Sequence, residues 1–416
     1  MPLGLYISIP FCRTKCSYCN FASGVFSKSA YENYVGRVLE DIARSRALAA
    51  ELGCALDTRA DSVYLGGGTP SILDAPQLLR IFAAVRGQFA IAPDAEITVE
   101  CAPGTLTPAL IETLLQCGVN RVSLGVQSFV DREAQSVGRL HKRSTVLEEI
   151  ARLREAGLHN INIDLIAGLP HQTAESWAFS LSETIATGAP HVSVYMLEVD
   201  DDSRLGRELI AGGARYHAHF VPDDDATADF YQQACEMLAG AGIAQYEISN
   251  FARSAAELRD NKLHSNESRH NLKYWTRQPY LGFGVDAHSM LTVDHHEDGR
   301  PMAVRFATPD SLDAYMNRAP HTVTPVSAQA AIEESFFLGL RLNRGVDLES
   351  LRGDFRLQQN FSRDAVAVWK SAVEQSVQDG LLEQQGTTVR LTAHGRLLSN
   401  EVFARFLAEE KVGTGT

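Results

Sequence analysis

Three cysteines stand close together near the start of the chain, at Cys12, Cys16 and Cys19 in the stretch FCRTKCSYCNF. Cysteine thiolates hold iron–sulfur clusters, and a four-iron cluster normally takes four of them. Three thiolates leave one iron without a protein ligand, and an open metal position is where a substrate or cofactor can bind. A zinc site or a buried trio is the alternative, but zinc would need a fourth ligand, and Phe21 stands where one could follow. The spacing therefore favours a cluster with one open iron.

Polar and glycine residues follow several of the apolar runs farther along the chain. The stretch GGGTP, residues 66–70, has glycines that let backbone amides approach a ligand and form an anion-binding nest. Glu100, Gln127 and Asp164 each lie in or just after a later apolar run. Each alone is equally well read as a satisfied polar group at a strand end. Together they predict one ring of polar side chains around a common site.

These residues need a scaffold, and the chain alternates short β-rich runs with amphipathic helical stretches. Repeated βα units predict parallel strands with right-handed crossovers, hence an α/β barrel or an open doubly wound sheet. In a barrel, sites are built at the C-terminal ends of the strands, where the polar residues fall. The predicted strands are 5–9, 62–67, 96–101, 120–126, 160–168 and 191–197, and the predicted helices are 29–52, 75–88, 108–117, 145–156 and 174–187.

The sequence divides into three regions of different character. Residues 1–222 hold the βα alternation. Residues 223–321 are expected to extend that core, with a helix near 224–241 and a strand at 245–249. Residues 322–410 change to helices, then the hairpin-like LLEQQGTTVRLT and a last helix, a pattern typical of a winged-helix-like domain.

Composition excludes several classes of protein. The 416 residues carry a formal charge of −13 and no basic stripe, which argues against nucleic acid as a partner. No apolar run reaches the length that predicts a transmembrane helix, although peripheral contact with a membrane stays open. The N-terminus lacks a basic region and a cleavage site, so it is expected to be a first strand in a cytoplasmic protein.

A second group of candidate residues is the stretch HNLKYW, from His270 to Trp275. If it is helical, His270 and Tyr274 share one face, and so do Asn271 and Trp275. An imidazole can ligate haem iron, and aromatic rings can stack on a porphyrin. A histidine among aromatic residues is also commonly structural. His288, in the glycine-rich GFGVDAHS, is a second candidate ligand.

The stretch CRTKCSYC resembles the cluster loop of the radical S-adenosylmethionine (SAM) superfamily. The resemblance is closest to its coproporphyrinogen III dehydrogenase-like group and, within that group, to the HemW haem chaperones. It covers nearly the whole chain through YISIPFC, GGGTPS, VSLGVQSF, DLIAGLP, QYEISNFA, RHNLKYW and YLGFGVDAHS. It implies a partial (β/α)6 barrel with a C-terminal helical, winged-helix-like domain. It also implies a [4Fe-4S] cluster whose open iron binds SAM, which the reduced cluster splits into methionine and a 5′-deoxyadenosyl radical.

Individual residues match the family's motifs, and none of them is assigned a catalytic role. Two positions depart from the family's usual pattern, Ser8 and Ala102, which puts details around the cluster and SAM in doubt. The SAM contacts implied by the resemblance are Gly67, Gly68, Thr69, Glu100, Gln127, Arg139 and Asp164, with Tyr6, Tyr18 and Leu197 matching more loosely. The haem contacts implied by the family's HNxxYW motif are His270, Asn271, Tyr274 and Trp275.

Phe21 separates two branches of the group. The dehydrogenases typically carry a fourth cysteine at this place and a longer segment before the cluster, whereas the HemW-type proteins carry phenylalanine. The resemblance therefore implies a haem carrier on an enzyme scaffold, which delivers haem to acceptor haemoproteins. The alternatives are an oxygen-independent coproporphyrinogen III dehydrogenase, which decarboxylates two propionates oxidatively, and a radical SAM enzyme with another substrate.

Overall fold

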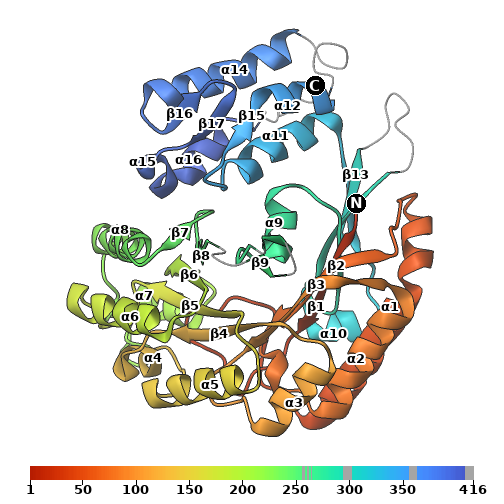
Figure 1. Ribbon diagram of the computed structural model, residues 1–416, viewed down its shortest axis with the longest axis vertical. Helices are drawn as coiled ribbons and strands as arrows, with labels where there is room; N and C mark the ends of the chain where they lie inside the picture. Colours follow the sequence, from red (N-terminus) through yellow and green to blue (C-terminus); the bar gives the residue numbers. More distant parts are fainter. Residues whose placement is uncertain (255–257, 260–261, 264, 294–301, 356–362, 408–416) are drawn as a thin grey trace.

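A large, open β-sheet organises the computed structural model (Figure 1). The structure describes residues 1–254, 258–259, 262–263, 265–293, 302–355 and 363–407. Six parallel strands run side by side in chain order at the centre of the sheet. They are β1 (Leu3–Ile9), β2 (Arg59–Gly67), β3 (Ala90–Cys101), β4 (Arg121–Gln127), β5 (Ile161–Ala167) and β6 (His191–Met196).

Helices connect these strands and cover the outer face of the curved sheet (Figure 1). The strands are buried almost throughout, as parallel strands covered on both faces must be. Capping residues fix several helix starts, for example Asp74, whose side chain accepts from the amide of Gln77 at 3.0 Å. The connecting helices are α1 (Lys28–Glu51), η1 (Pro70–Ile72), α2 (Ala75–Gln88), α3 (Pro108–Gln116), α4 (Asp131–Ser136), α5 (Arg143–Glu155) and α6 (Ala174–Thr187).

Further strands extend the sheet at both edges, so it holds twelve strands and stays open between β14 and β7. At one edge, β11 (Tyr280–Phe283) pairs parallel to β1. Antiparallel β12 (His288–Thr292), β13 (Ala303–Ala307) and β14 (Thr322–Val326) follow. At the other edge, β8 (Asn250–Arg253) and β7 (Ile243–Gln245) continue from β6. The predicted partial barrel of six βα units is therefore confirmed, with additional strands on either side.

The strand expected at 245–249 is wrong, because only Gln245 belongs to a strand, β7, and residues 246–249 form a tight turn before β8. The amide of Asn250 donates to the carbonyl of Glu247 at 3.3 Å, and the amide of Ser249 donates to the Glu247 carboxylate at 3.0 Å. These bonds fold β8 back on β7, because polar side chains beside the turn compete with a sheet ladder. The remaining elements between β6 and β13 are α7 (Arg204–Ala211), η2 (Ala218–Phe220), α8 (Asp224–Gly240), β9 (Leu258–Arg259), β10 (Lys262–Leu263) and α9 (Arg269–Trp275).

The C-terminal part is helical with a small sheet, as predicted. After α10 (Leu312–Met316) and β14, its helices are α11 (Ala328–Gly339), α12 (Leu348–Phe355), α14 (Arg363–Gln378), α15 (Ala393–Leu397) and α16 (Ser399–Ala404). Its sheet has the order β15 (Val346–Asp347), β17 (Thr388–Leu391), β16 (Leu382–Gln385). A second core fills it, in which Phe336 and Phe406 stack at 4.5 Å. Met290 and Val326 of the large sheet join this core, so the two parts pack together.

Among the described residues, none of the helices has the combination of length and apolar sequence that crossing a membrane requires.

Candidate functional site

The loop between β1 and α1 carries the three cysteines into a cavity of about 370 Å³. The loop is closed at its neck, where the amide of Cys12 donates to the carbonyl of Gly24 and the amide of Gly24 donates to Pro10, both at 2.9 Å. Hydroxyl groups stand beside two of the thiols: Thr69 Oγ1 lies 3.7 Å from Cys12 Sγ. Ser23 Oγ lies 3.8 Å from Cys19 Sγ. The thiols are thus held half-buried and face a shared space.

The cysteine set fits a cluster better than a single metal ion. Burial raises the pKa of the Cys12 thiol, hydrogen bonds from Thr69 and Ser23 lower it, and the neighbouring Cys19 and Cys16 raise it further. A zinc ion needs its ligands around one centre, whereas a cluster takes one thiolate at each of several irons.

The ends of β3, β4 and β5 bring the predicted polar ring to the same cavity. Glu100, Gln127, Arg139 and Asp164 all line it. Gln127 has a φ of 68°, at a register shift between β4 and β5, which is uncommon for a residue other than glycine. Such backbone strain concentrates at functional sites. The strand-end ring predicted from the sequence is assembled in the structure.

Arg139 lines this cavity and is partly satisfied within the protein. One guanidinium nitrogen donates to the hydroxyl of Tyr18 at 3.0 Å. Its Nε is buried and has no hydrogen-bond partner in the described part of the chain. A buried donor left without a partner costs free energy, and such groups are uncommon in folded proteins.

Two buried carboxyl groups, Glu100 and Asp164, face the cavity, and both have a pKa above the usual value. Burial, and then repulsion from Asp164, raise the pKa of Glu100 to about 7, and the hydroxyl of Tyr64 donates to it at 2.8 Å. Burial also raises the pKa of Asp164, against hydrogen bonds that favour its carboxylate. Two of these bonds come from Ser123 at 3.0 Å and Asn162 at 2.7 Å. Such shifts are typical of binding and catalytic sites.

The glycine run after β2 acts differently from the amide nest that its sequence predicts. The amide of Gly68 donates to the carbonyl of Ile9, and that of Thr69 to the carbonyl of Phe11, both at 2.8 Å. A Cβ added at Gly68 would lie 2.8 Å from both carbonyl oxygens. Gly67 and Gly68 line the cavity. The absence of a side chain at Gly68 allows the end of β2 to pack closely against the base of the cysteine loop.

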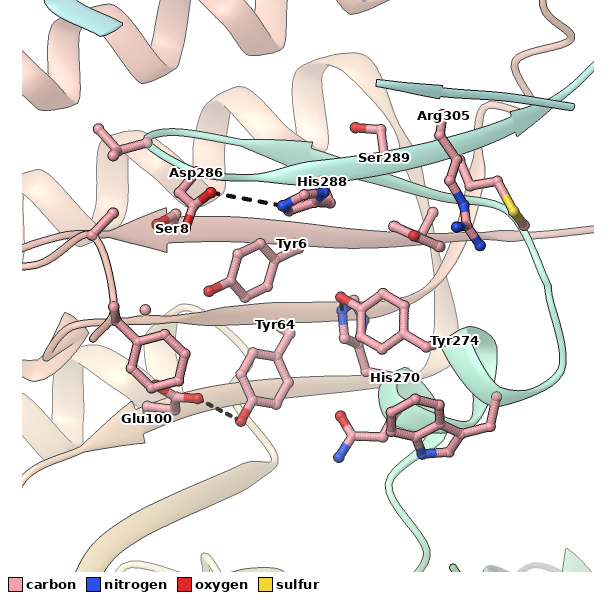
Figure 2. Close-up of a pocket in the computed structure, with 18 of the residues that line it drawn as sticks. Tyr6, Ser8, Tyr64, Glu100, His270, Tyr274, Asp286, His288, Ser289 and Arg305 are labelled. Carbon is pink, nitrogen blue, oxygen red and sulfur yellow. Dashed lines mark hydrogen bonds and ion pairs between the residues drawn. The ribbon is translucent and has the colours of Figure 1, made fainter. Parts of the chain in front are cut away.

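A larger cavity of about 680 Å³ adjoins the first one and shares part of its wall (Figure 2). Tyr6 lines the larger cavity, whereas Tyr18 and Leu197 line the smaller one, so the loosely matched residues divide between the two. Ser8 and Ala102, where the sequence departs from the family pattern, line the larger and the smaller cavity, respectively. The shared wall consists of Phe21, Tyr64, Gly67, Glu100, Tyr195 and Asn271.

Phe21 is not buried against the cysteine loop. Its side chain is 62% exposed and lines both cavities. Phe21 therefore stands at the opening where the two cavities meet.

The predicted helix at HNLKYW is present as α9, and its four candidate residues line the larger cavity (Figure 2). Glu96 accepts from the first amides of the helix, those of Arg269 and His270, at 3.0 Å each. A carboxylate at a helix N-terminus is stabilising. Trp275 has Arg341 stacked on its indole ring, with the guanidinium carbon 4.2 Å from the ring centroid. The helix is thus fixed firmly against the sheet.

His270 is buried and bonded at both ring nitrogens. Nδ1 lies 3.0 Å from Ser62 Oγ and Nε2 lies 2.8 Å from the Tyr274 hydroxyl. Its ring also stacks on Tyr64, with centroids 5.2 Å apart. Burial, and then the charges of Lys273 and Arg121, lower the pKa of His270 to about 3. The imidazole is therefore neutral at physiological pH.

Several lining residues had not been expected from the sequence. Tyr64 lies two places before the glycine run, and the alternation of its strand could have placed it on the inner face. Arg121, buried beside Asp164 and Glu100, gives no sequence signal because it opens a strand like any polar flanking residue. Tyr280 and Arg305 reach the larger cavity only because β11 and β13 extend the sheet.

Comparisons with known proteins agree with this arrangement. The radical SAM superfamily model matches residues 6–182, and the HemN C-terminal domain model matches residues 326–398. Proteins named heme chaperone HemW are similar over nearly all of the chain. The one from Bacillus subtilis is 31% identical, with 97% of this chain and 99% of that protein covered. The one from Escherichia coli is 30% identical, with 98% and 99% covered.

A third HemW protein, from Synechocystis, is 36% identical, with 83% of this chain and 79% of that protein covered. Among solved structures, the Escherichia coli coproporphyrinogen III oxidase HemN, described as a radical SAM enzyme, superposes with a TM-score of 0.79. It is 24% identical, and the match covers 97% of this chain and 90% of that one. That likeness shows a common fold. The chain belongs to the radical SAM superfamily and, within it, to the family of the HemW heme chaperones.

Proposed function

We propose that this chain is a haem chaperone, which binds haem in its larger cavity and delivers it to acceptor haemoproteins. The observation that carries the proposal is the aromatic cavity of about 680 Å³ beside the cysteine-lined one. Its volume lies in the usual range of small-molecule pockets, and its aromatic walls suit a flat porphyrin. The relatives that match nearly the full chain carry the name heme chaperone.

The radical SAM family implies a [4Fe-4S] cluster and SAM, and we assign both to the smaller cavity. Cys12, Cys16 and Cys19 would each ligate one iron and leave one iron open. In this superfamily the cluster supplies the electron that cleaves SAM. The guanidinium group of Arg139 and the carboxylate of Asp164, which both line this cavity, would hold the polar groups of SAM.

Glu100 and Tyr64 would form the partition between SAM and haem. Because burial raises the pKa of Glu100 to about 7, this carboxyl group can carry a proton near neutral pH. A neutral carboxyl beside an apolar porphyrin costs less desolvation energy than a carboxylate. Phe21, exposed at the common opening, would contact haem as it enters or leaves.

We place this activity in the cytoplasm and without nucleic acid as a partner. Three of the seven cysteines lie within eight residues, Cys12 to Cys19, a pattern that suits a cluster in a reducing compartment better than a disulfide framework. The formal charge of −13 disfavours binding to a phosphate backbone.

Parallel assays on the anaerobically reconstituted protein test the proposal against the dehydrogenase alternative. Haem is titrated and the Soret band is followed, while coproporphyrinogen III and SAM are incubated with the same preparation. We expect saturable haem binding and no decarboxylated product. Turnover of coproporphyrinogen III without haem binding would overturn the proposal.

A further inference from the structure

Two histidines of this chain line the larger cavity, and they offer haem iron very different access. His270 is only 1% exposed, and each of its ring nitrogens already faces a hydroxyl group. Iron ligation needs a nitrogen lone pair within direct bonding distance of the metal. His270 would have to break a buried hydrogen bond to Ser62 or Tyr274 and rotate away from its stacking partner Tyr64.

His288 has the opposite surroundings. Its side chain is 69% exposed and projects into the larger cavity from β12 (Figure 2). The nearest acidic group is Asp286, whose Oδ1 lies 3.7 Å from His288 Nε2, beyond hydrogen-bond distance. The imidazole can therefore rotate and offer a nitrogen to a metal without breaking a buried contact.

The carboxylate beside His288 matches a recurrent feature of metal sites. Histidines that bind metals usually donate their other ring N–H to a carboxylate, which fixes the ring and raises its basicity. Asp286 lies beside His288 in the turn between β11 and β12, where it could accept this hydrogen bond. It has a φ of 54°, and its amide donates to the carbonyl of Pro309 at 2.9 Å.

The same sheet face supplies a cation. In the β12–β13 pair, Met290 lies opposite Arg305, so His288, Met290 and Arg305 share one face of the sheet. Arg305 binds Glu334 at 3.1 Å through one terminal nitrogen, and its side chain is 36% exposed and lines the larger cavity. The remaining guanidinium donors suit a carboxylate, and haem carries two propionates.

We propose that His288 is the axial ligand of haem iron, with Asp286 orienting its imidazole and Arg305 binding a propionate. The inference rests on the proposed function, because it assigns the residues that hold the haem cargo. His270 then belongs to the wall, where it fixes Tyr274 and Tyr64 in place. The porphyrin plane would lie among Tyr274, Trp275, Tyr280, Met290, Phe337 and Leu338.

The test is a haem titration of the full reconstituted chain, followed by absorption spectroscopy of the Soret band. His288→Ala should shift this band and weaken haem binding, and added imidazole should restore the wild-type spectrum. Asp286→Asn should weaken binding by roughly tenfold or more, as loss of such supporting groups does. His270→Gln should keep the axial-ligand spectrum even if affinity falls. His219→Ala, an exposed position outside the cavity, is the matched control.

A second arm tests the propionate contact. Arg305→Ala should weaken binding of haem but not of haem dimethyl ester, which has no propionate carboxylates. Equal weakening for both compounds would overturn the role of Arg305.

The outcomes distinguish a failure of the proposed function from a failure of the ligand assignment. If the wild type binds no haem, the proposed function fails. If the wild type binds haem and His288→Ala leaves the spectrum unchanged, only the assignment of the ligand fails. In that case, a shifted spectrum in His270→Gln would assign the ligand to the HNLKYW helix.

Discussion

Two residues that line the smaller cavity, Arg139 and Gln127, have energetically unfavourable features. Arg139 keeps a buried Nε with no hydrogen-bond partner among the described residues, and Gln127 keeps an uncommon backbone conformation. Both features cost free energy in the folded protein. Costs of this kind are typical of functional sites, so residues here should affect ligand binding more than folding.

The three cysteines make the most direct prediction at this scale. Replacing Cys12, Cys16 or Cys19 by Ala should remove most of the iron bound after anaerobic reconstitution, because each thiol would hold one corner of the cluster. Iron analysis and the cluster absorbance measure this loss. Cys235→Ala, on α8 and outside both cavities, should bind iron like the wild type. Full iron content in the triple variant would refute the assignment.

Asp164 allows a similar test for SAM. Asp164→Asn removes the negative charge while its neighbours Ser123 and Asn162 remain. A hydrogen bond to a charged group contributes roughly 1.5–3 kcal/mol, so SAM should bind about 10- to 100-fold more weakly. Calorimetry on reconstituted protein would measure this change, with the exposed ion-pair residue change Arg143→Gln as control. Equal affinities for Asp164→Asn and the wild type would exclude this contact.

Sequence reasoning worked best for residues whose type and spacing carry the chemistry. The cysteine trio and the strand-end ring of Glu100, Gln127 and Asp164 were predicted to share one site, and they do line one cavity. The burial of His270 could not be predicted in this way. Its partner Ser62 lies on β2, more than two hundred positions away in sequence, and only the packing of α9 on the sheet brings them together.

Among the elements, the turn after β2 depends on glycine for packing. Gly68→Ala would place a methyl group 2.8 Å from the carbonyl oxygens of Ile9 and Phe11. Overpacking of this kind costs about 1–3 kcal/mol, so the thermal midpoint of the apoprotein should fall without any ligand present. Gly87→Ala near the end of α2 meets nothing within 4 Å and should be neutral or slightly stabilising. Equal midpoints for both variants would contradict this reading of the turn.

Helix α9 predicts a pH dependence of stability. Burial lowers the pKa of His270 to about 3, whereas an unfolded chain has a histidine pKa of about 6.5. Below pH 6.5 the imidazole takes up a proton in the unfolded state but not in the folded state. The free energy of unfolding therefore falls as the pH falls towards 3. Proton linkage at this group alone lowers the free energy of unfolding by about 2 kcal/mol between pH 7 and pH 5.

Denaturant unfolding of His270→Gln and the wild type at pH 7 and pH 5 measures this contribution. The difference between the two pH values should be smaller in the variant by about 2 kcal/mol. His219→Gln, at an exposed position, should behave like the wild type. An unchanged pH dependence in His270→Gln would show that burial of this imidazole does not control acid stability.

Element boundaries were predictable where periodicity was strong and not where a turn intervened. The six βα units and α9 appear where the sequence places them. The strand expected at 245–249 became a turn, because the Glu247 carboxylate captures the amide of Ser249. The strands β11 to β14 have no βα alternation to mark them, and they join the sheet through the pairing of β11 with β1, which is made at long range.

At the scale of the whole molecule, the two cavities are built from different parts of one sheet. The smaller cavity lies over the ends of β2 to β6. The larger one lies over β1, β2 and the added strands β11 to β13 (Figure 2). Phe337 and Leu338 of α11 close the larger cavity from the C-terminal part. Loss of that part should therefore expose the larger cavity while leaving the cysteine loop in place.

The central claim is that haem is held in the cavity next to the cluster, and magnetic relaxation tests it most directly. The electron paramagnetic resonance signal of the reduced cluster would be recorded at increasing microwave power, with and without haem. Zinc protoporphyrin, which is diamagnetic and has the same ring, is the control. We predict that haem makes the cluster signal harder to saturate, because a paramagnetic iron in the adjoining cavity speeds its relaxation, and that zinc protoporphyrin does not. Identical saturation curves for the empty and the haem-loaded protein would place haem elsewhere and contradict the account.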